Sequence, residues 1–175
     1  MPNWCENIWR IAGRNETEAR EIFDVLTTEI FDVLTTEGRD AERRVTFEKL
    51  LPMPAILEKL TRGGAMIDGE RVSVWIEEAD ADGVCVRRTP TAEEQAEIDA
   101  TGAPDWYEWR LAHWGCKWDA AHTSEADLDG DLVTLRFDTP WGPPVGVIDA
   151  IRERWPEANL SAFYHEPGVE AAGYL

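Results

Sequence analysis

Two strand–helix–strand patterns, one near each end of the chain, constrain the fold more than any other feature. In the first pattern, residues 7–12 alternate apolar and polar side chains, a helical stripe follows, and residues 45–51 form a second apolar run that ends at prolines. In the second, residues 132–137 and 160–164 are predicted strands on either side of a helix that a Pro-Pro pair opens. Strands and helices that alternate in this order predict a mixed α and β fold.

The order of these elements predicts a ferredoxin-like split β-α-β sandwich of the α+β class. In that fold a four-stranded antiparallel sheet carries two helices on one face. The chain has 175 residues, which fits one domain with a long insertion better than two domains. We therefore expect a single domain over residues 1–175, with residues 53–130 inserted between the two halves.

An exact internal repeat lies in the first predicted helix. Residues 21–28 read Glu-Ile-Phe-Asp-Val-Leu-Thr-Thr, and residues 29–36 repeat them without a change. The apolar residues of both copies recur at helical spacing, so the pattern predicts one continuous helix. Asn15 is the predicted N-cap and Gly38 the predicted stop.

Several shorter elements are predicted inside the insertion. Residues 55–60 indicate a short helix ended by Gly63-Gly64, and residues 72–76 and 84–87 indicate a hairpin. Thr91 and Glu94 form a capping box that predicts a helix over residues 91–100. Another helix is predicted over residues 106–114, which Gly115 ends.

The formal net charge of the chain is −18, which argues against direct binding to nucleic acid or to anionic lipid. The excess is concentrated, because residues 61–130 hold 16 acidic and 6 basic side chains. One interpretation is a well-solvated surface; the other is a surface that imitates a polyanion. The candidate partner-binding carboxylates are those of Glu77, Glu78, Asp80, Asp82, Glu93, Glu94 and Glu97.

The cysteines indicate the compartment and exclude some site classes. Cys5, Cys85 and Cys116 are odd in number and widely spaced, so neither a disulfide framework nor a structural zinc site is expected. The sequence shows no signal peptide and no apolar run long enough for a membrane span. We expect a cytoplasmic protein with no cofactor and no metal.

Tryptophan is the strongest chemical signal in the sequence. Trp109, Trp118 and Trp141 could line a ligand cleft, with Arg110 and Lys117 beside them to hold an anion. The alternative is that these indoles cover the sheet as core residues. The sequence leaves both alternatives open.

Evidence for catalysis is weak. His113, Cys116 and Asp119 recur at a spacing of three, but Gly115 breaks the helix between them. The pair His165-Glu166 lies at a strand end, where a polar pair is ordinary. No phosphate-binding loop, dinucleotide fingerprint, nucleophile elbow or His-Glu-x-x-His motif is present. We therefore expect a protein that is not an enzyme, with His113 or His165 as the catalytic alternative.

Four sequence blocks resemble the YubB-type ferredoxin-like family, whose members are carried by phages and plasmids. The blocks begin Met-Pro-Asn-Trp-Cys, Trp-Tyr-Glu-Trp, Phe-Asp-Thr-Pro-Trp-Gly-Pro-Pro and Tyr-His-Glu-Pro-Gly, and they cover residues 1–5, 106–119, 137–144 and 164–168. Residues 61–104 are not matched. The resemblance implies a fold and a mobile-element setting, and it implies no catalytic residues. Three scattered cysteines do not supply an iron–sulfur ligand set.

These observations favour a non-enzymatic accessory protein of a mobile element. Its acidic surface would occupy the basic, nucleic-acid-binding groove of a host complex, such as a defence system of the CRISPR or restriction type, and act as a DNA mimic. The alternative is a small-ligand binding module with a Trp-lined cleft. An enzyme and a purely self-associating protein are the remaining hypotheses, and the oligomeric state is left open.

Overall fold

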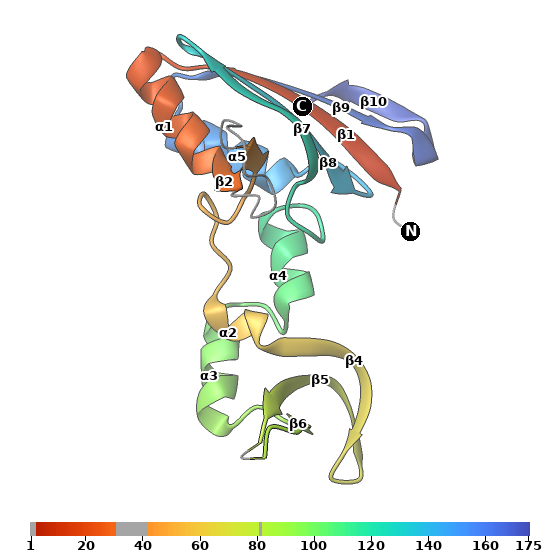
Figure 1. Ribbon diagram of the computed structural model, residues 1–175. Coiled ribbons are helices and arrows are strands. Elements are labelled where there is room, and N and C mark those ends of the chain that lie inside the picture. Colours follow the sequence, from red (N-terminus) through yellow and green to blue (C-terminus); the bar gives the residue numbers. More distant parts are fainter. Residues whose placement is uncertain (1–2, 31–41, 81) are drawn as a thin grey trace, which may run out of the picture. The chain divides into compact units, whose positions relative to one another are not determined.

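The computed structural model describes residues 3–30, 42–80 and 82–175 (Figure 1). The chain divides into two compact units. One, the sheet unit, comprises Met1–Pro52 and His113–Leu175. The other, the middle unit, comprises Met53–Ala112. The described residues form a mixed α+β structure with antiparallel sheets and five α-helices.

The sheet unit is built on a five-stranded antiparallel sheet in the order β10-β9-β1-β8-β7. Helices α1 and α5 lie on the same side of it (Figure 1). The 3-10 turn η1 (Pro167–Val169) joins β9 to β10. The bounds are β1 Trp4–Ala12, α1 Glu16–Leu26, β7 Ala121–Asp129, β8 Leu132–Pro140, α5 Val145–Arg154, β9 Asn159–Glu166 and β10 Ala171–Tyr174.

Without β10, the five-stranded sheet and its helices α1 and α5 have the β-α-β-β-α-β connectivity of a ferredoxin-like fold. Two parts of the prediction are wrong. The sheet has five strands and not four, because β10 adds to the edge beside β9. The strand that follows α1 in the fold is β7, and not residues 45–51, because β7 is the strand that pairs with β8. The residues between α1 and β7 therefore interrupt the first β-α-β half, and residues 113–130 belong to the sheet unit.

Alternation along the strands explains why one face of the sheet is buried. In β1, Trp9 and Ile11 are fully buried while Arg10 between them is exposed. Aromatic rings fill the space beneath that face. Trp9 meets Phe137 edge to face with 4.9 Å between ring centroids, and Phe47 contacts both Phe137 and Trp114. This aromatic core joins segments far apart in the sequence.

The duplicated octad does not form one continuous helix. Helix α1 ends at Leu26, where Thr27 takes extended dihedral angles and its hydroxyl donates to the Phe23 carbonyl at 2.6 Å. Residues Thr27–Ile30 form β2, which pairs with β3 (Glu42–Val45). The second copy beyond Ile30 and the predicted stop at residue 38 lie outside the described residues. The predicted N-cap is confirmed, because the Asn15 side chain accepts from the Glu18 N–H at 3.0 Å.

The middle unit contains a three-stranded antiparallel sheet in the order β4-β5-β6. The predicted hairpin is confirmed as β5 and β6, and the capping box of α3 is confirmed. The predicted stop at Gly63-Gly64 is wrong, because both glycines lie inside β4, where a Cβ on Gly63 would crowd the Trp75 ring. The bounds are α2 Ala55–Glu58, β4 Leu60–Ile67, β5 Glu70–Ala79, β6 Cys85–Arg88, α3 Ala92–Ala100 and α4 Trp106–His113.

In the part of the chain that the structure describes, no helix is both long enough and apolar enough to cross a membrane.

Candidate functional site

Arginines of β6 pair with several of the predicted partner-binding carboxylates. Glu77 and Arg87 face each other across β5 and β6, with Arg87 Nε 2.9 Å from a Glu77 carboxylate oxygen. Arg88 bridges Glu78 at 2.7 Å and Glu94 at 2.6 Å. Three of the seven carboxylates are therefore held in ion pairs within the middle unit.

These contacts lower the pKa values of the carboxyl groups. Hydrogen bonds from Arg88, and then from the Thr91 N–H, lower the pKa of Glu94 to about 2. The pKa of Glu77 is lowered first by the Trp75 indole N–H and then by Arg87, and that of Glu78 is lowered by Arg88. All three groups carry their charge at neutral pH. Because they lie near the surface, solvent and salt weaken the pairs.

The other four predicted carboxylates divide into two kinds. Asp80 shapes its own turn, since its side chain accepts from the backbone N–H groups of Asp82 and Val84, both at 2.9 Å. Asp82, Glu93 and Glu97 are exposed, and among residues 3–30, 42–80 and 82–175 their carboxylates have no hydrogen-bond or ion-pair partner. The latter three are the carboxylates that remain available to another molecule.

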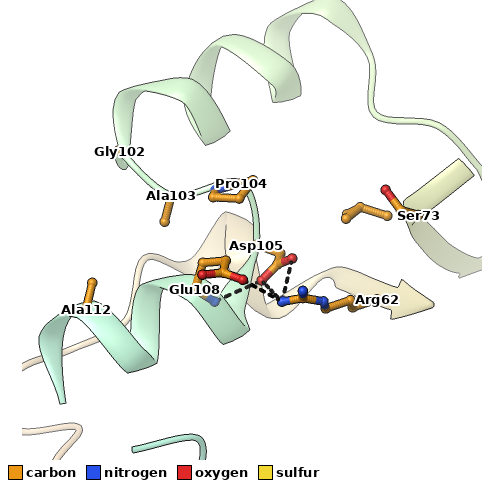
Figure 2. A pocket seen from close by; sticks show the side chains of 9 residues that line it. Arg62, Ser73, Gly102, Ala103, Pro104, Asp105, Glu108 and Ala112 are labelled. Atoms are coloured by element: carbon orange, nitrogen blue, oxygen red, sulfur yellow. Dashed lines mark hydrogen bonds and ion pairs between the residues drawn. The ribbon is translucent and has the colours of Figure 1, made fainter. Parts of the chain in front are cut away.

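A cavity of about 520 Å³ lies in the middle unit (Figure 2). Its charged lining residues are Arg62, Asp105 and Glu108, and Arg62 lies 3.4 Å from Asp105 and 3.1 Å from Glu108, in ion pairs that the dashed lines mark. Asp105 is buried and caps α4 by accepting from the N–H groups of Tyr107 and Glu108. A hydrogen bond to Glu108 is the largest cause of the raised pKa of Arg62. The charges of this cavity satisfy one another, which favours a structural role.

The structure brings together some of the predicted Trp cleft in the sheet unit. Trp118 and Trp141 have ring centroids 5.9 Å apart, and the Lys117 ammonium lies 4.7 Å from the first and 5.6 Å from the second. Trp4 extends the group, 6.4 Å from Trp118 and 4.6 Å from His122. We call these five residues the tryptophan cluster. Half of the Trp141 surface is exposed, and its backbone is left-handed with φ of 64°.

The remaining predicted cleft residues belong to the middle unit. Trp109 is buried there, and the Arg110 guanidinium lies over the Trp106 ring at 5.4 Å. Sequence reasoning missed Trp4 and His122. The sequence holds a signal that could have identified Trp4 as a surface residue. The alternation of β1 places Trp4 on the face opposite the buried Trp9.

The groups considered for catalysis are dispersed in the structure. His113 is exposed at the end of α4, and the buried Cys116 thiol donates to the Trp118 carbonyl. The Asp119 carboxylate accepts hydrogen bonds from the Thr46 hydroxyl and the Phe47 N–H. His165 and Glu166 are consecutive in β9, so their side chains point to opposite faces. Across the described ranges, no three His, Cys, Asp or Glu side chains group closely enough to hold a metal ion.

The Cys5 thiol is buried beneath the sheet, and burial is the main cause that raises its pKa to about 11. A thiol with such a pKa is protonated at neutral pH and is a poor nucleophile.

Comparison with known proteins gives a family match for the C-terminal part of the chain. The sequence model of the family described as "Ferredoxin-like domain in Api92-like protein" matches residues 116–175, which contain β7, β8, α5, β9 and β10. The match supports a ferredoxin-like family for this part of the chain, in agreement with the strand order. No curated protein and no solved structure matches the chain.

Proposed function

We propose that this chain is a non-catalytic binding protein whose middle unit presents carboxylates to a basic, nucleic-acid-binding surface of a partner protein. The observation that carries the proposal is the charge of one segment. Residues 77–99 hold eight acidic and two basic side chains, and Asp82, Glu93 and Glu97 keep exposed carboxylates with no partner within the described ranges. Such a surface attracts the arginines and lysines that otherwise bind phosphates.

The arginines of β6 give this surface a defined geometry. Arg87 and Arg88 hold three carboxylates at set positions and leave net negative charge around them. Pre-positioned charges lose little side-chain entropy when a partner binds. Association through them is fast and weakens as salt is added.

The setting of this function is part of the same proposal. The resemblance to YubB-type proteins of phages and plasmids supports a mobile-element protein, and three widely spaced cysteines support a reducing cytoplasm. A host defence complex of the CRISPR or restriction type fits as the partner, because it holds nucleic acid in a basic groove. The acidic surface would then act as a DNA mimic.

The test compares two triple variants with equal changes of charge. D82N/E93Q/E97Q removes the available carboxylates, and D127N/D129N/E153Q removes three exposed carboxylates of the sheet unit. Each protein is used to capture partners from nuclease-treated host lysate at low and high salt, and the captured protein is purified and re-bound in the presence of nucleic acid.

We expect the native protein and the sheet-unit variant to capture a nucleic-acid-binding protein at low salt only. Added nucleic acid should reduce this capture, because it competes for the same basic surface of the partner. The middle-unit variant should capture much less. Equal capture by the two variants, or capture that nucleic acid does not reduce, would overturn the proposal.

The tryptophan cluster supports a second candidate function, a small-ligand site. The supporting observation is the Lys117 ammonium above two indoles, one of them half exposed. The test is Trp fluorescence of the native protein and of W141F during titration with monosaccharides, disaccharides and nucleotides. A saturable change in the native protein that W141F lacks would support the site, and spectra unaffected by every compound would remove it.

A further inference from the structure

Helices α1 and α5 cover one face of the five-stranded sheet (Figure 1). The opposite face carries a shallow groove of about 240 Å³. Its lining comes from β1, β8, β9 and β10. We call it the open-face groove, and its residues are Ile8, Arg10, Arg136, Ser161, Phe163 and Tyr174. None of these residues belongs to the acidic surface or to the tryptophan cluster.

Strand register places four of these side chains in one row across the sheet. Arg136 is paired with Ile8, Ile8 with Phe163, and Phe163 with Tyr174. Residues paired in this way point to the same face, and neighbouring strands are about 4.8 Å apart. The row therefore spans about 14 Å from a guanidinium to a phenol ring.

The aromatic end of the row is exposed to solvent. The Phe163 and Tyr174 rings meet edge to face with centroids 5.2 Å apart, and 73% of the Tyr174 surface is accessible. The solvent-facing side of an antiparallel sheet is ordinarily polar, so an exposed aromatic pair there needs a reason. Aromatic rings in this position can stack on a planar ligand.

The other end of the groove carries two arginines, although the chain as a whole is acidic. The lining includes two guanidinium groups and no carboxylate. Arg10 is exposed and makes no ion pair with any described residue. Arg136 forms ion pairs with Glu6 and Glu125, each at 3.8 Å, and this distance is too long for a hydrogen bond to either carboxylate. Both guanidinium groups therefore have donors available for an anion.

The size of the groove and the surrounding charge limit the ligand. Glu125, Asp127 and Asp129 pair with β8 residues of the same face, so a carboxylate row lies along the β7 edge. Together with the net charge of −18, this row repels a long polynucleotide. A ligand with one planar ring and one phosphate fits the groove without crossing that edge.

We propose that the open-face groove binds a nucleoside monophosphate. The base stacks on the exposed Tyr174 ring, with the Phe163 ring inclined beside it, and the phosphate accepts hydrogen bonds from Arg10 and Arg136. This site is independent of the proposed partner surface, since its residues lie in the sheet unit and the carboxylates lie in the middle unit.

The test is equilibrium dialysis of the full chain with each of the four common ribonucleoside monophosphates. The variants are R10Q and Y174A, both at exposed positions that leave the core intact. R20Q is the matched control, because it removes the same charge from an exposed position on α1. A nucleoside, inorganic phosphate and a single-stranded decanucleotide complete the set of probes.

The proposal expects saturable binding of at least one monophosphate, weakened about tenfold or more in R10Q and in Y174A and unchanged in R20Q. The nucleoside and inorganic phosphate should each bind more weakly than the monophosphate. The proposal is overturned if no monophosphate binds saturably, if both groove variants bind like the native protein, or if the decanucleotide binds more tightly than every monophosphate.

Discussion

Asp119 provides the sharpest test of the structure, because its carboxylate joins distant segments of the sheet unit. It accepts from the Thr46 hydroxyl at 2.7 Å, the Phe47 N–H at 2.7 Å and the Ala120 N–H at 2.8 Å. Thr46 and Phe47 are buried, so water cannot replace the lost acceptor. We predict that D119A destabilises the protein strongly.

The magnitude follows from the three hydrogen bonds. A hydrogen bond to a charged group contributes about 1.5–3 kcal/mol, and a buried donor left without a partner costs about 1–3 kcal/mol. Because the three share one carboxylate, their contributions do not add fully, and we expect a loss of about 3–5 kcal/mol. For a chain of this size that corresponds to a Tm about 6–20 °C lower.

The matched variant is D119N, which keeps an oxygen for the two backbone N–H groups. Its amide can also donate to the Thr46 hydroxyl, so we expect D119N to lose only about 1–2 kcal/mol. D127A, at an exposed position, should change stability by less than about 0.5 kcal/mol.

The assay is urea denaturation followed by far-ultraviolet circular dichroism and by Trp fluorescence, with the slope of the transition compared among the variants. If D119A unfolds within about 1 kcal/mol of the native protein, the carboxylate does not join these segments and the argument fails.

Three further predictions follow from the same structure. G146A should fold poorly, because a Cβ there would collide with the His113 carbonyl, whereas G142A, with open space around it, should behave like the native protein in thermal denaturation. Under native conditions a maleimide reagent should label Cys85 alone, because the other two thiols are buried; mass spectrometry that finds rapid double labelling would contradict this. The pKa of Glu94 is about 2 in the folded chain and about 4.5 when unperturbed, so its contribution to stability is present above about pH 4.5 and is lost as pH falls towards 2. The stability difference between native protein and E94Q should therefore shrink over that range in urea titrations, and a difference independent of pH would contradict the assignment.

Local sequence signals predicted the parts of the fold that depend on near neighbours. The alternation of residues 132–137 and 160–164 located β8 and β9, and the cap residues Asn15 and Thr91 marked the starts of α1 and α3. Each of these signals involves residues only a few positions apart, so it can be read directly from the sequence.

The octad repeat shows where local signals fail. Glu21-Ile22 is helical in α1, whereas the identical Glu29-Ile30 lies in strand β2. The same residues take both conformations because Thr27 ends the helix and β3 offers a pairing partner. Propensity is therefore overridden by pairing with a distant strand.

The candidate sites, like the fold, were predicted only in part. Sequence reasoning identified Lys117, Trp118 and Trp141, which the structure brings together, and it missed the open-face groove entirely. The groove depends on the register of four strands, which no local pattern records. The carboxylates of Glu77 and Glu78 are not available to a partner, because arginines of the neighbouring strand β6 pair with them.

The sequence by itself determined strands β1, β8 and β9, helix α5, the caps of α1 and α3 and the acidic balance. Only the tertiary structure decided that β7 completes the sheet, that β10 extends it, and which charges are left available. The physical reason is that strand pairing and ion pairing are contacts between residues far apart in the chain. Asp119 and Thr46 lie 73 positions apart, and no local pattern records their meeting.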